Sequence, residues 1–145
     1  MPRFPLFALA ATALLLLVLT TPAAHAIINS TVQARLTHPF IVGNTTLPPG
    51  EYDFRMVHGT DHRVMSISNM QNTVNVEFLV RACTDSQTPR HSQLVFERYG
   101  QSEVLTNVYD SGNKYGEAVV EPSHILDRLK KQDPKPYQHT EQQSQ

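Results

Sequence analysis

The alternation of apolar and polar residues between Val74 and Ala82 is the feature that most constrains the fold. Valine, phenylalanine or alanine occupies every second position of this segment, polar residues lie between them, and Leu79 is the one exception. A period of two places all the alternating apolar side chains on one face of an extended chain. The segment therefore predicts a half-buried β-strand.

Six further segments show the same character and are separated by residues that favour turns. They are residues 32–42, 51–56, 63–68, 93–99, 103–110 and 114–120. His38-Pro39 interrupts the first, because proline cannot donate to a strand ladder. Turn-separated strands at a spacing of roughly 8 to 12 residues are typical of sandwiches and barrels. The sequence predicts an all-β fold, a small antiparallel β-sandwich or barrel of six to seven strands.

The N-terminus has the pattern of an export signal. Arg3 precedes the apolar stretch 5–19, and Ala24 and Ala26 place small residues where a signal peptidase reads. A retained membrane anchor is the alternative, but it needs roughly 20 apolar residues, more than this stretch contains. We expect residues 1–26 to be a cleaved signal peptide, the protein to be periplasmic or secreted, and no membrane span to remain.

The remaining chain divides into three parts. Residues 27–121 contain the predicted strands and form the β domain. Residues 122–132 predict one short C-terminal helix, because Ile125, Leu126 and Leu129 fall at helical spacing behind a proline. Residues 133–145 are polar and proline-bearing, which predicts a disordered tail.

Charge and cysteine content exclude some functions. Without Arg3, eleven basic residues face thirteen acidic ones, so the mature net charge is −2 with neutral histidines. The chain lacks the basic patch that nucleic-acid binding requires. Cys83 is the single cysteine, so no intramolecular disulfide can form. No motif calls for a cofactor, and stability must come from the core.

The segment Leu47-Pro48-Pro49-Gly50 predicts a rigid corner rather than a chemical site. Pro49 presets the φ of the second position of a type II turn, and Gly50 can take the positive φ of the third. Gly43 is expected to end the first strand, and the connection to Gly50 is too long for a two-residue hairpin. We expect Tyr52 to enter the core and to tie its hydroxyl back to the loop backbone, as tyrosine corners do.

Two motifs carry a resemblance to a known family. Phe40-x-Val42-Gly43-x-x-x-Leu47-Pro48-x-Gly50-x-Tyr52 is followed by Leu94-x-Phe96-x-Arg98-Tyr99-Gly100. Together they resemble a family of small exported β proteins that recurs in acidobacterial genomes and has no assigned activity. The resemblance covers residues 32–109 and implies the fold only. Family members often end the second motif in tryptophan, which this chain lacks entirely.

A metal site is one hypothesis for the histidines. His58, Asp61 and His62 flank a tight turn, and two imidazoles with a carboxylate could hold Zn²⁺ or Cu²⁺. A further ligand would have to come from His38, His91 or His124. A solvated turn is the favoured alternative, because loop histidines lack the hydrogen-bonded surroundings that orient metal ligands.

Other candidate residues are equally open to a structural interpretation. Cys83 lies near Asp85 and His91 in sequence and could be a nucleophile, but an outward-facing lone thiol is the favoured interpretation. Arg98 could bind an anion or could be a cation at the rim of the core beside an acidic partner. The candidate ligand-binding residues are Arg98, Tyr99 and Tyr109, and a small stacking surface would combine Tyr99 and Tyr109 with Tyr115.

Two function classes remain. One is a noncatalytic exported module that binds a protein, an envelope component or a small ligand, which needs only an exposed edge or a concave face. The other is a hydrolytic or metal-dependent enzyme, which needs convergent titratable groups that the sequence does not show. The binding module is the prediction, and the identity of its partner is unknown.

Overall fold

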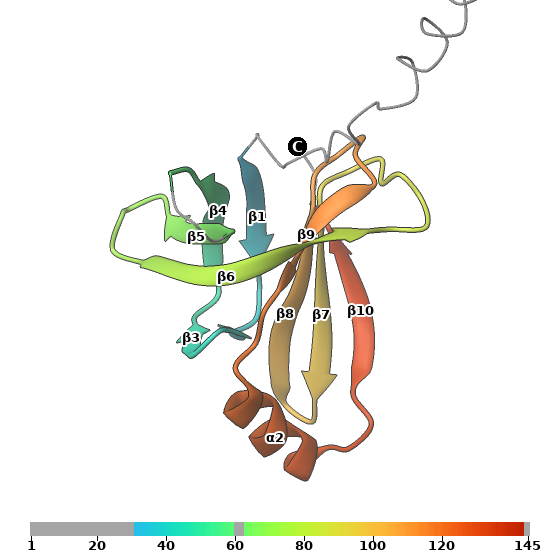
Figure 1. Cartoon of the computed structure of the whole chain (residues 1–145). Helices are drawn as coiled ribbons and strands as arrows, with labels where there is room; N and C mark the ends of the chain where they lie inside the picture. Colours follow the sequence, from blue (N-terminus) through green and yellow to red (C-terminus); the bar gives the residue numbers. More distant parts are fainter. Residues whose placement is uncertain (1–30, 60–62, 144–145) are drawn as a thin grey trace, which may run out of the picture.

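The computed structural model describes residues 31–59 and 63–143, and these residues form ten strands and one helix with their connecting turns (Figure 1). The strands are β1 (Val32–Leu36), β2 (Phe40–Val42), β3 (Thr45–Leu47), β4 (Gly50–Val57), β5 (Val64–Asn69), β6 (Asn75–Thr84), β7 (Gln93–Tyr99), β8 (Ser102–Tyr109), β9 (Tyr115–Val119) and β10 (Tyr137–Gln142). The helix is α2 (Ser123–Gln132). The predicted all-β character and the single short helix are confirmed.

The strands form one sheet in the order β1-β4-β5-β6-β9-β8-β2-β3, with β7 paired to β8 and β10 paired to β7. All pairings among the described residues are antiparallel except β2–β8, which is parallel. The pairs β2–β3, β4–β5, β5–β6, β7–β8 and β8–β9 are consecutive in the chain, whereas β1–β4, β6–β9, β2–β8 and β7–β10 are joined by longer connections. The expected six to seven strands become ten, because the first predicted strand divides at His38-Pro39 and because β3 and β10 were not predicted.

The long strand β6 joins the two halves of the sheet. Its first half pairs with β5 and its second half with β9, so it crosses the molecule (Figure 1). Phe78 and Val80 are buried, as the alternation predicts, but Ala82 is exposed and Cys83 is half-buried. The face of β6 that meets the core thus changes after Val80, where the strand passes from one part of the sheet to the other.

The core has two parts. The larger cluster packs the inward side chains of the two halves against one another, and it comprises Val32, Ala34, Leu36, Phe40, Val42, Leu47, Tyr52, Phe54, Met65, Ile67, Phe78, Val80, Leu94, Phe96, Leu105 and Val108. The smaller cluster packs the helix against the sheet. There Ile125 and Leu129 of α2 contact Tyr99 and Val104. The helix thereby closes the end of β7 and β8 (Figure 1).

The corner at Leu47–Gly50 is confirmed in one respect and corrected in another. Tyr52 is buried and its hydroxyl donates to the carbonyl of Pro48 at 2.6 Å, as expected. Gly50, however, does not have a positive φ and already belongs to β4. This position requires a small residue for a different reason. A Cβ at Gly50 would lie 3.3 Å from Cε2 of Tyr52, because the tyrosine ring folds back over the glycine.

The connection from Gly43 to Gly50 also differs from expectation. Gly43 ends β2, as predicted, but Val42 pairs with Thr45, so Gly43 and Asn44 form a two-residue hairpin turn. Gly43 has a φ of 56°, and a positive φ at the first turn position suits the tight hairpins that connect twisted strands. The prediction failed because β3 has three residues, too few to show an alternation.

The predicted disordered tail, residues 133–145, is corrected by β10. Residues 137–142 pair with β7 from Tyr137 opposite Arg98 to Gln142 opposite Gln93. The segment is polar on both faces, so apolar alternation could not reveal it. Its order comes from backbone pairing and from polar side-chain contacts.

Some predictions fall on residues that the structure does not describe. The signal peptide, residues 1–26, lies outside the described ranges, and so do Asp61 and His62. Among the described residues no helix has the length and apolar content to cross a membrane.

Candidate functional site

A cleft with both polar and apolar walls lies on the outer face of the strands β6 to β10 and has a volume of about 420 Å³. We call it the sheet groove. Its lining residues are Arg81, Glu97, Thr106, Asn107, Ala118, Val119, Val120, Glu121, Leu126 and Gln138. Five strands, the β9–α2 connection and the helix all contribute. Two other clefts among the described residues are larger, one of about 530 Å³ beside the loop 85–93 and one of about 500 Å³ beside the Pro48–Gly50 corner. The sheet groove is the candidate because hydrogen-bonding groups from several elements converge in it.

The register of the sheet brings the groove residues together. Glu97 of β7 lies directly opposite Gln138 of β10. Between β7 and β8 the register shifts, so that Val95 opposes Asn107 while Phe96 opposes Leu105. Thr106 is the extra residue of this bulge. A bulge changes the direction of side chains, which allows both Thr106 and Asn107 to line the groove.

Glu121 is the most perturbed group in the groove. Its Oε1 accepts a hydrogen bond from the backbone N–H of Gly43 at 2.9 Å, whereas its Oε2 is buried and has no hydrogen-bond partner among the described residues. Burial raises the pKa of Glu121 to about 7, against the lowering effect of the Gly43 hydrogen bond. Near neutral pH this carboxyl group can therefore act as a donor or as an acceptor.

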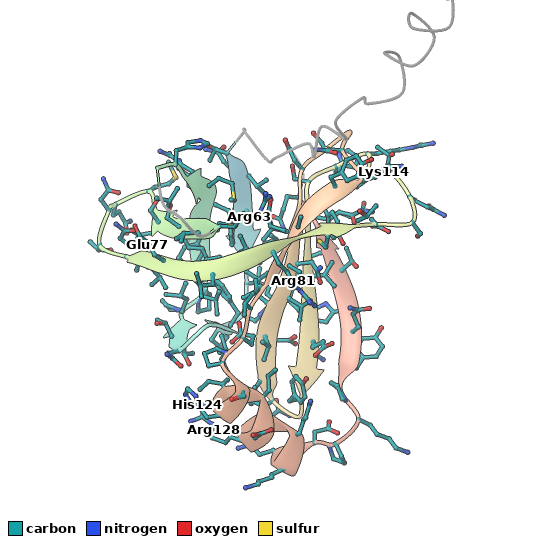
Figure 2. All side chains as sticks on the ribbon, in the orientation of Figure 1. Arg63, Glu77, Arg81, Lys114, His124 and Arg128 are labelled. Carbon is teal, nitrogen blue, oxygen red and sulfur yellow. The ribbon has the colours of Figure 1, made fainter. Side chains whose placement is uncertain are left out.

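Two charged side chains of opposite sign accompany Glu121. Arg81 extends from the exposed face of β6 (Figure 2). Glu97 is held by Tyr99, whose hydroxyl donates to Glu97 Oε2 at 2.7 Å. Burial, the hydrogen bond to Glu97 and its charge raise the pKa of Tyr99 to about 12, so the phenol keeps its proton. The groove thus offers a cation, an oriented anion and neutral amides.

A second polar group lies on the opposite face of β10, and we call it the His–Glu cluster. It consists of His38, His139, Glu103 and Glu141. His38 Nε2 lies 2.6 Å from Glu141 Oε1, and His139 Nε2 lies 2.8 Å from Glu103 Oε2. The two imidazole centroids are 6.4 Å apart. These pairs join β10 to the β1–β2 corner and to β8.

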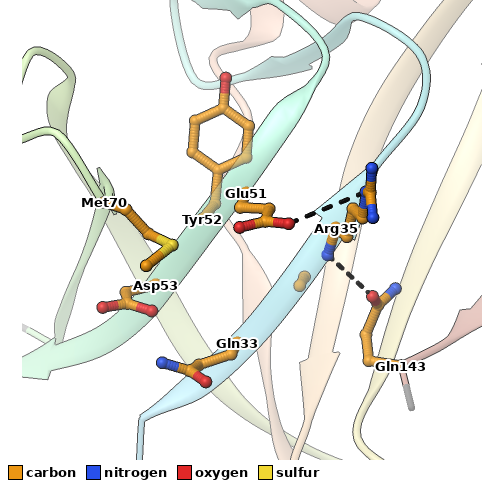
Figure 3. Close-up of a pocket in the computed structure, with 8 residues that line it drawn as sticks. Gln33, Arg35, Glu51, Tyr52, Asp53, Met70 and Gln143 are labelled. Carbon is orange, nitrogen blue, oxygen red and sulfur yellow. Dashed lines mark hydrogen bonds and ion pairs between the residues drawn. The ribbon is translucent and has the colours of Figure 1, made fainter. Parts of the chain in front are cut away.

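Figure 3 shows a third site, a shallow pocket of about 330 Å³ over β1 and β4. Arg35 Nε lies 3.8 Å from Glu51 Oε1 across it, and both side chains are more than half exposed. Arg55 pairs with Asp53 beside it at 2.8 Å. Because these charges already neutralise one another in solvent, the pocket is a weaker candidate than the sheet groove.

The predicted ligand-binding residues do not form one surface. Tyr99 and Tyr109 are both buried and lie at opposite ends of the β7–β8 pair, opposite Ser102 and Gln93 respectively. Tyr115 is partly exposed. Arg98 is half exposed and pairs with the buried Glu103, in agreement with a rim cation beside an acidic partner. The tyrosines therefore provide packing and hydrogen bonds rather than a stacking platform.

Cys83 is not the outward-facing thiol that the sequence predicted. It is half-buried, its Sγ lies 3.4 Å from the hydroxyl of Tyr109, and the amide of Asn107 donates to it at 3.4 Å. His91 is exposed. The thiol is in contact with a phenol and an amide, and neither of these is a general base that would activate it.

The metal hypothesis is only partly addressed, because Asp61 and His62 lie outside the described residues. His58 is exposed, and within residues 31–59 and 63–143 no three side chains of His, Cys, Asp or Glu are grouped to hold a metal ion. His38 belongs to the His–Glu cluster, and His124 is exposed on α2 (Figure 2).

The fold and the groove together define the described chain as a mainly antiparallel β protein with a cleft on one face of its sheet. Comparison of the chain with family models, with curated proteins and with solved structures finds no significant match. The site must therefore be interpreted from its own chemistry.

Proposed function

We propose that the protein is an exported, noncatalytic binding module and that its ligand occupies the sheet groove. The observation that carries this proposal is the convergence of Arg81, Glu97, Asn107 and Gln138, from four strands, on one cleft of about 420 Å³. Clefts of roughly 300 to 1,000 Å³ with a few convergent polar groups are typical of small-ligand sites. The export signal that the sequence predicts for residues 1–26 supports a periplasmic or secreted location.

The chemistry of the groove favours a short peptide as the ligand. A short peptide carries an ammonium at one end and a carboxylate at the other, and its amide groups both donate and accept. Glu97 suits the ammonium, Arg81 suits the carboxylate through its paired donors, and the amides of Asn107 and Gln138 suit the peptide bonds. A carbohydrate ligand is less well supported, because Tyr99 and Tyr109 are buried and cannot stack on a sugar.

Trialanine, its C-terminal amide and its N-acetyl derivative test the proposal in an NMR titration. We expect trialanine to shift signals of the groove residues, and each blocked form to bind about fivefold more weakly, the effect of one exposed ion pair. In Arg81→Gln the difference between trialanine and its amide should disappear, whereas Arg128→Gln, an exposed control on α2, should retain it. Shifts confined to other surfaces, or none at millimolar peptide, would contradict the proposal.

A hydrolytic enzyme is the second candidate, and Glu121 is the observation that favours it. A carboxyl group with a pKa near 7 in a cleft suits a general acid, and the carboxylate Glu97 lines the same cleft. Incubation of the same peptides with the protein distinguishes the two functions. The binding module leaves them intact, whereas an enzyme would cleave them and lose turnover in Glu121→Gln.

For the fold we propose the barrel form of the predicted architecture. The support comes from two of the three edge strands of the sheet, β1 and β10, which approach one another, whereas β3 is the third edge. The backbone N–H of Arg35 donates to the side-chain oxygen of Gln143 at 3.0 Å, and His38 contacts Glu141 nearby. Side chains rather than backbone pairs would then close the barrel along this seam.

A further inference from the structure

The two faces of β10 belong to different sites. Because side chains alternate along a strand, Gln138 lines the sheet groove while His139 and Glu141 lie on the opposite face. His139 stacks on the core residue Phe96 with a centroid distance of 5.7 Å. The strand that forms one wall of the groove is therefore held from behind by the His–Glu cluster.

The geometry around His38 favours its charged form. Nε2 lies 2.6 Å from Glu141 Oε1, and Nδ1 lies 3.3 Å from the carbonyl oxygen of Pro39. Both neighbours are acceptors, and only the imidazolium has two N–H donors. A neutral His38 would leave one of these contacts unmade.

The second half of the cluster is organised around Glu103. This carboxylate is almost fully buried, accepts from His139 at 2.8 Å and pairs on its other oxygen with Arg98 of β7. Four charged or titratable groups thus face one another at this seam: His38 from the β1–β2 corner, His139 and Glu141 from β10, and Glu103 from β8, with Arg98 beside them. Outside the backbone ladder with β7, they are the main polar attachment of β10.

We propose that β10 is a pH-dependent wall of the sheet groove, docked while His38 and His139 pair with Glu141 and Glu103 and loosened when the His38 pair loses its charge. Loosening β10 withdraws Gln138 from the groove and so weakens ligand binding. This regulatory role rests on the proposed function of the groove, whereas the release of β10 itself does not.

The pKa shifts of His38 and Glu103 determine how the docking of β10 depends on pH. Burial lowers the pKa of His38, but the hydrogen bonds to Glu141 and Pro39 and the charges of Glu141 and Glu103 raise it above 6.5. Burial raises the pKa of Glu103, but the hydrogen bonds and charges of His139 and Arg98 lower it below 4.5. The stabilisation of the docked strand by His38 is complete below pH 6.5 and is lost as pH rises through the raised pKa of His38. The stabilisation by Glu103 is complete above pH 4.5 and is lost as pH falls through the lowered pKa of Glu103. β10 is therefore docked most strongly between pH 4.5 and pH 6.5.

Hydrogen exchange of the full mature chain, read by mass spectrometry from pH 5.5 to pH 9, tests the release. After correction for intrinsic exchange rates, protection of the β10 amides should fall roughly tenfold across this range while that of β8 stays constant. His38→Gln, which can still donate to Glu141 but has no titratable charge, should remove most of this dependence. His124→Gln changes an exposed histidine on α2 and should preserve it. Equal protection of β10 at both ends of the range, or the same dependence in His38→Gln as in the wild type, would overturn the proposal.

Trialanine binding measured at the same pH values shows whether the docking of β10 affects ligand binding in the sheet groove. The ammonium of trialanine and Glu121 also titrate in this range, so the wild type is compared with His38→Gln. A smaller loss of binding between pH 5.5 and pH 9 in His38→Gln than in the wild type supports the role of β10. The same loss in both proteins, or equal affinity at both values while β10 exchange rises, would overturn it. Absence of binding at every pH would contradict the proposed function and the regulation of the groove together, and the exchange result would then decide the release of β10 by itself.

Discussion

The hydroxyl of Tyr52 donates to the carbonyl of Pro48 at 2.6 Å, four residues earlier in the chain. This hydrogen bond closes the corner between β3 and β4 and brings the tyrosine ring over the Cα of Gly50. The ring also meets Phe40 edge-on with a centroid distance of 5.5 Å. One side chain thus links the corner to the main core.

Removal of this hydroxyl should cost a measurable part of the stability. Tyr52→Phe keeps the ring and its core contacts but leaves the Pro48 carbonyl without this donor. We expect the free energy of unfolding to fall by about 0.5 to 1.5 kcal/mol in urea denaturation. Tyr115→Phe is the matched control, because Tyr115 is partly exposed and should change stability by less than about 0.5 kcal/mol. Equal effects at both positions would contradict a structural role for the hydroxyl.

Substitution by alanine should reduce stability much more at Gly116 than at Gly50, the two described glycines without a positive φ. A Cβ at Gly116 would overlap the ring of Tyr109 and lie 2.6 Å from the backbone oxygen of Val108, whereas a Cβ at Gly50 meets only the Tyr52 ring at 3.3 Å. Gly116→Ala should cost about 2 to 3 kcal/mol and Gly50→Ala about 1 kcal/mol or less. Thermal or chemical unfolding measures both. The reverse order would show that the ring of Tyr109 yields more easily than that of Tyr52.

Loss of Arg63 should be more damaging than loss of an exposed arginine. Its guanidinium pairs with Glu117, which is 1% exposed. Arg63→Gln leaves this carboxylate buried without a counter-charge, so the free energy of unfolding should fall by about 3 kcal/mol. Arg55→Gln removes a solvent-exposed pair with Asp53 and should cost less than about 1 kcal/mol. Similar small losses in both variants would show that solvent reaches Glu117.

The pH dependence of stability should report on Glu121. Its pKa is raised by burial to about 7, so the folded state favours the proton more than the unfolded state does. This contribution is complete below pH 4.5 and is lost as pH rises through about 7. Glu121→Gln keeps an acceptor for Gly43 and should remove this decline, by at most about 2 kcal/mol once partial exposure is discounted. An unchanged pH profile between 4.5 and 8 would contradict the assignment.

The sequence predicted those parts of the fold that depend on the burial of apolar side chains. The inward positions of β4 and the tie between Tyr52 and the Pro48 loop followed from local pattern and turn chemistry. Gly50 was misinterpreted, because a glycine behind two prolines suggests a positive φ, whereas here its size matters for a ring two residues away. β10 was missed because its residues are polar and its order depends on partners in β7, β8 and the β1–β2 corner.

The candidate site was beyond sequence reasoning for a related reason. Arg81, Glu97 and Gln138 each occupy an outward position and read individually as solvated side chains. Their convergence depends on the crossing of β6 and on the register of β7 with β10. Burial perturbs Glu121, and its hydrogen-bond partner Gly43 lies 78 residues away in the chain. Contacts at such separation leave no local pattern.

Photoaffinity labelling with a diazirine derivative of trialanine tests the central claim most directly, because it reports where the peptide lies. We expect cross-links at residues 81, 97, 106–107 or 138, protection by excess unlabelled trialanine, and strong loss of labelling in Arg81→Gln but not in Arg128→Gln. Labelling that instead concentrates around Arg35, Glu51 and Met70, the pocket of Figure 3, or that is unaffected by Arg81→Gln, would contradict the sheet groove as the binding site.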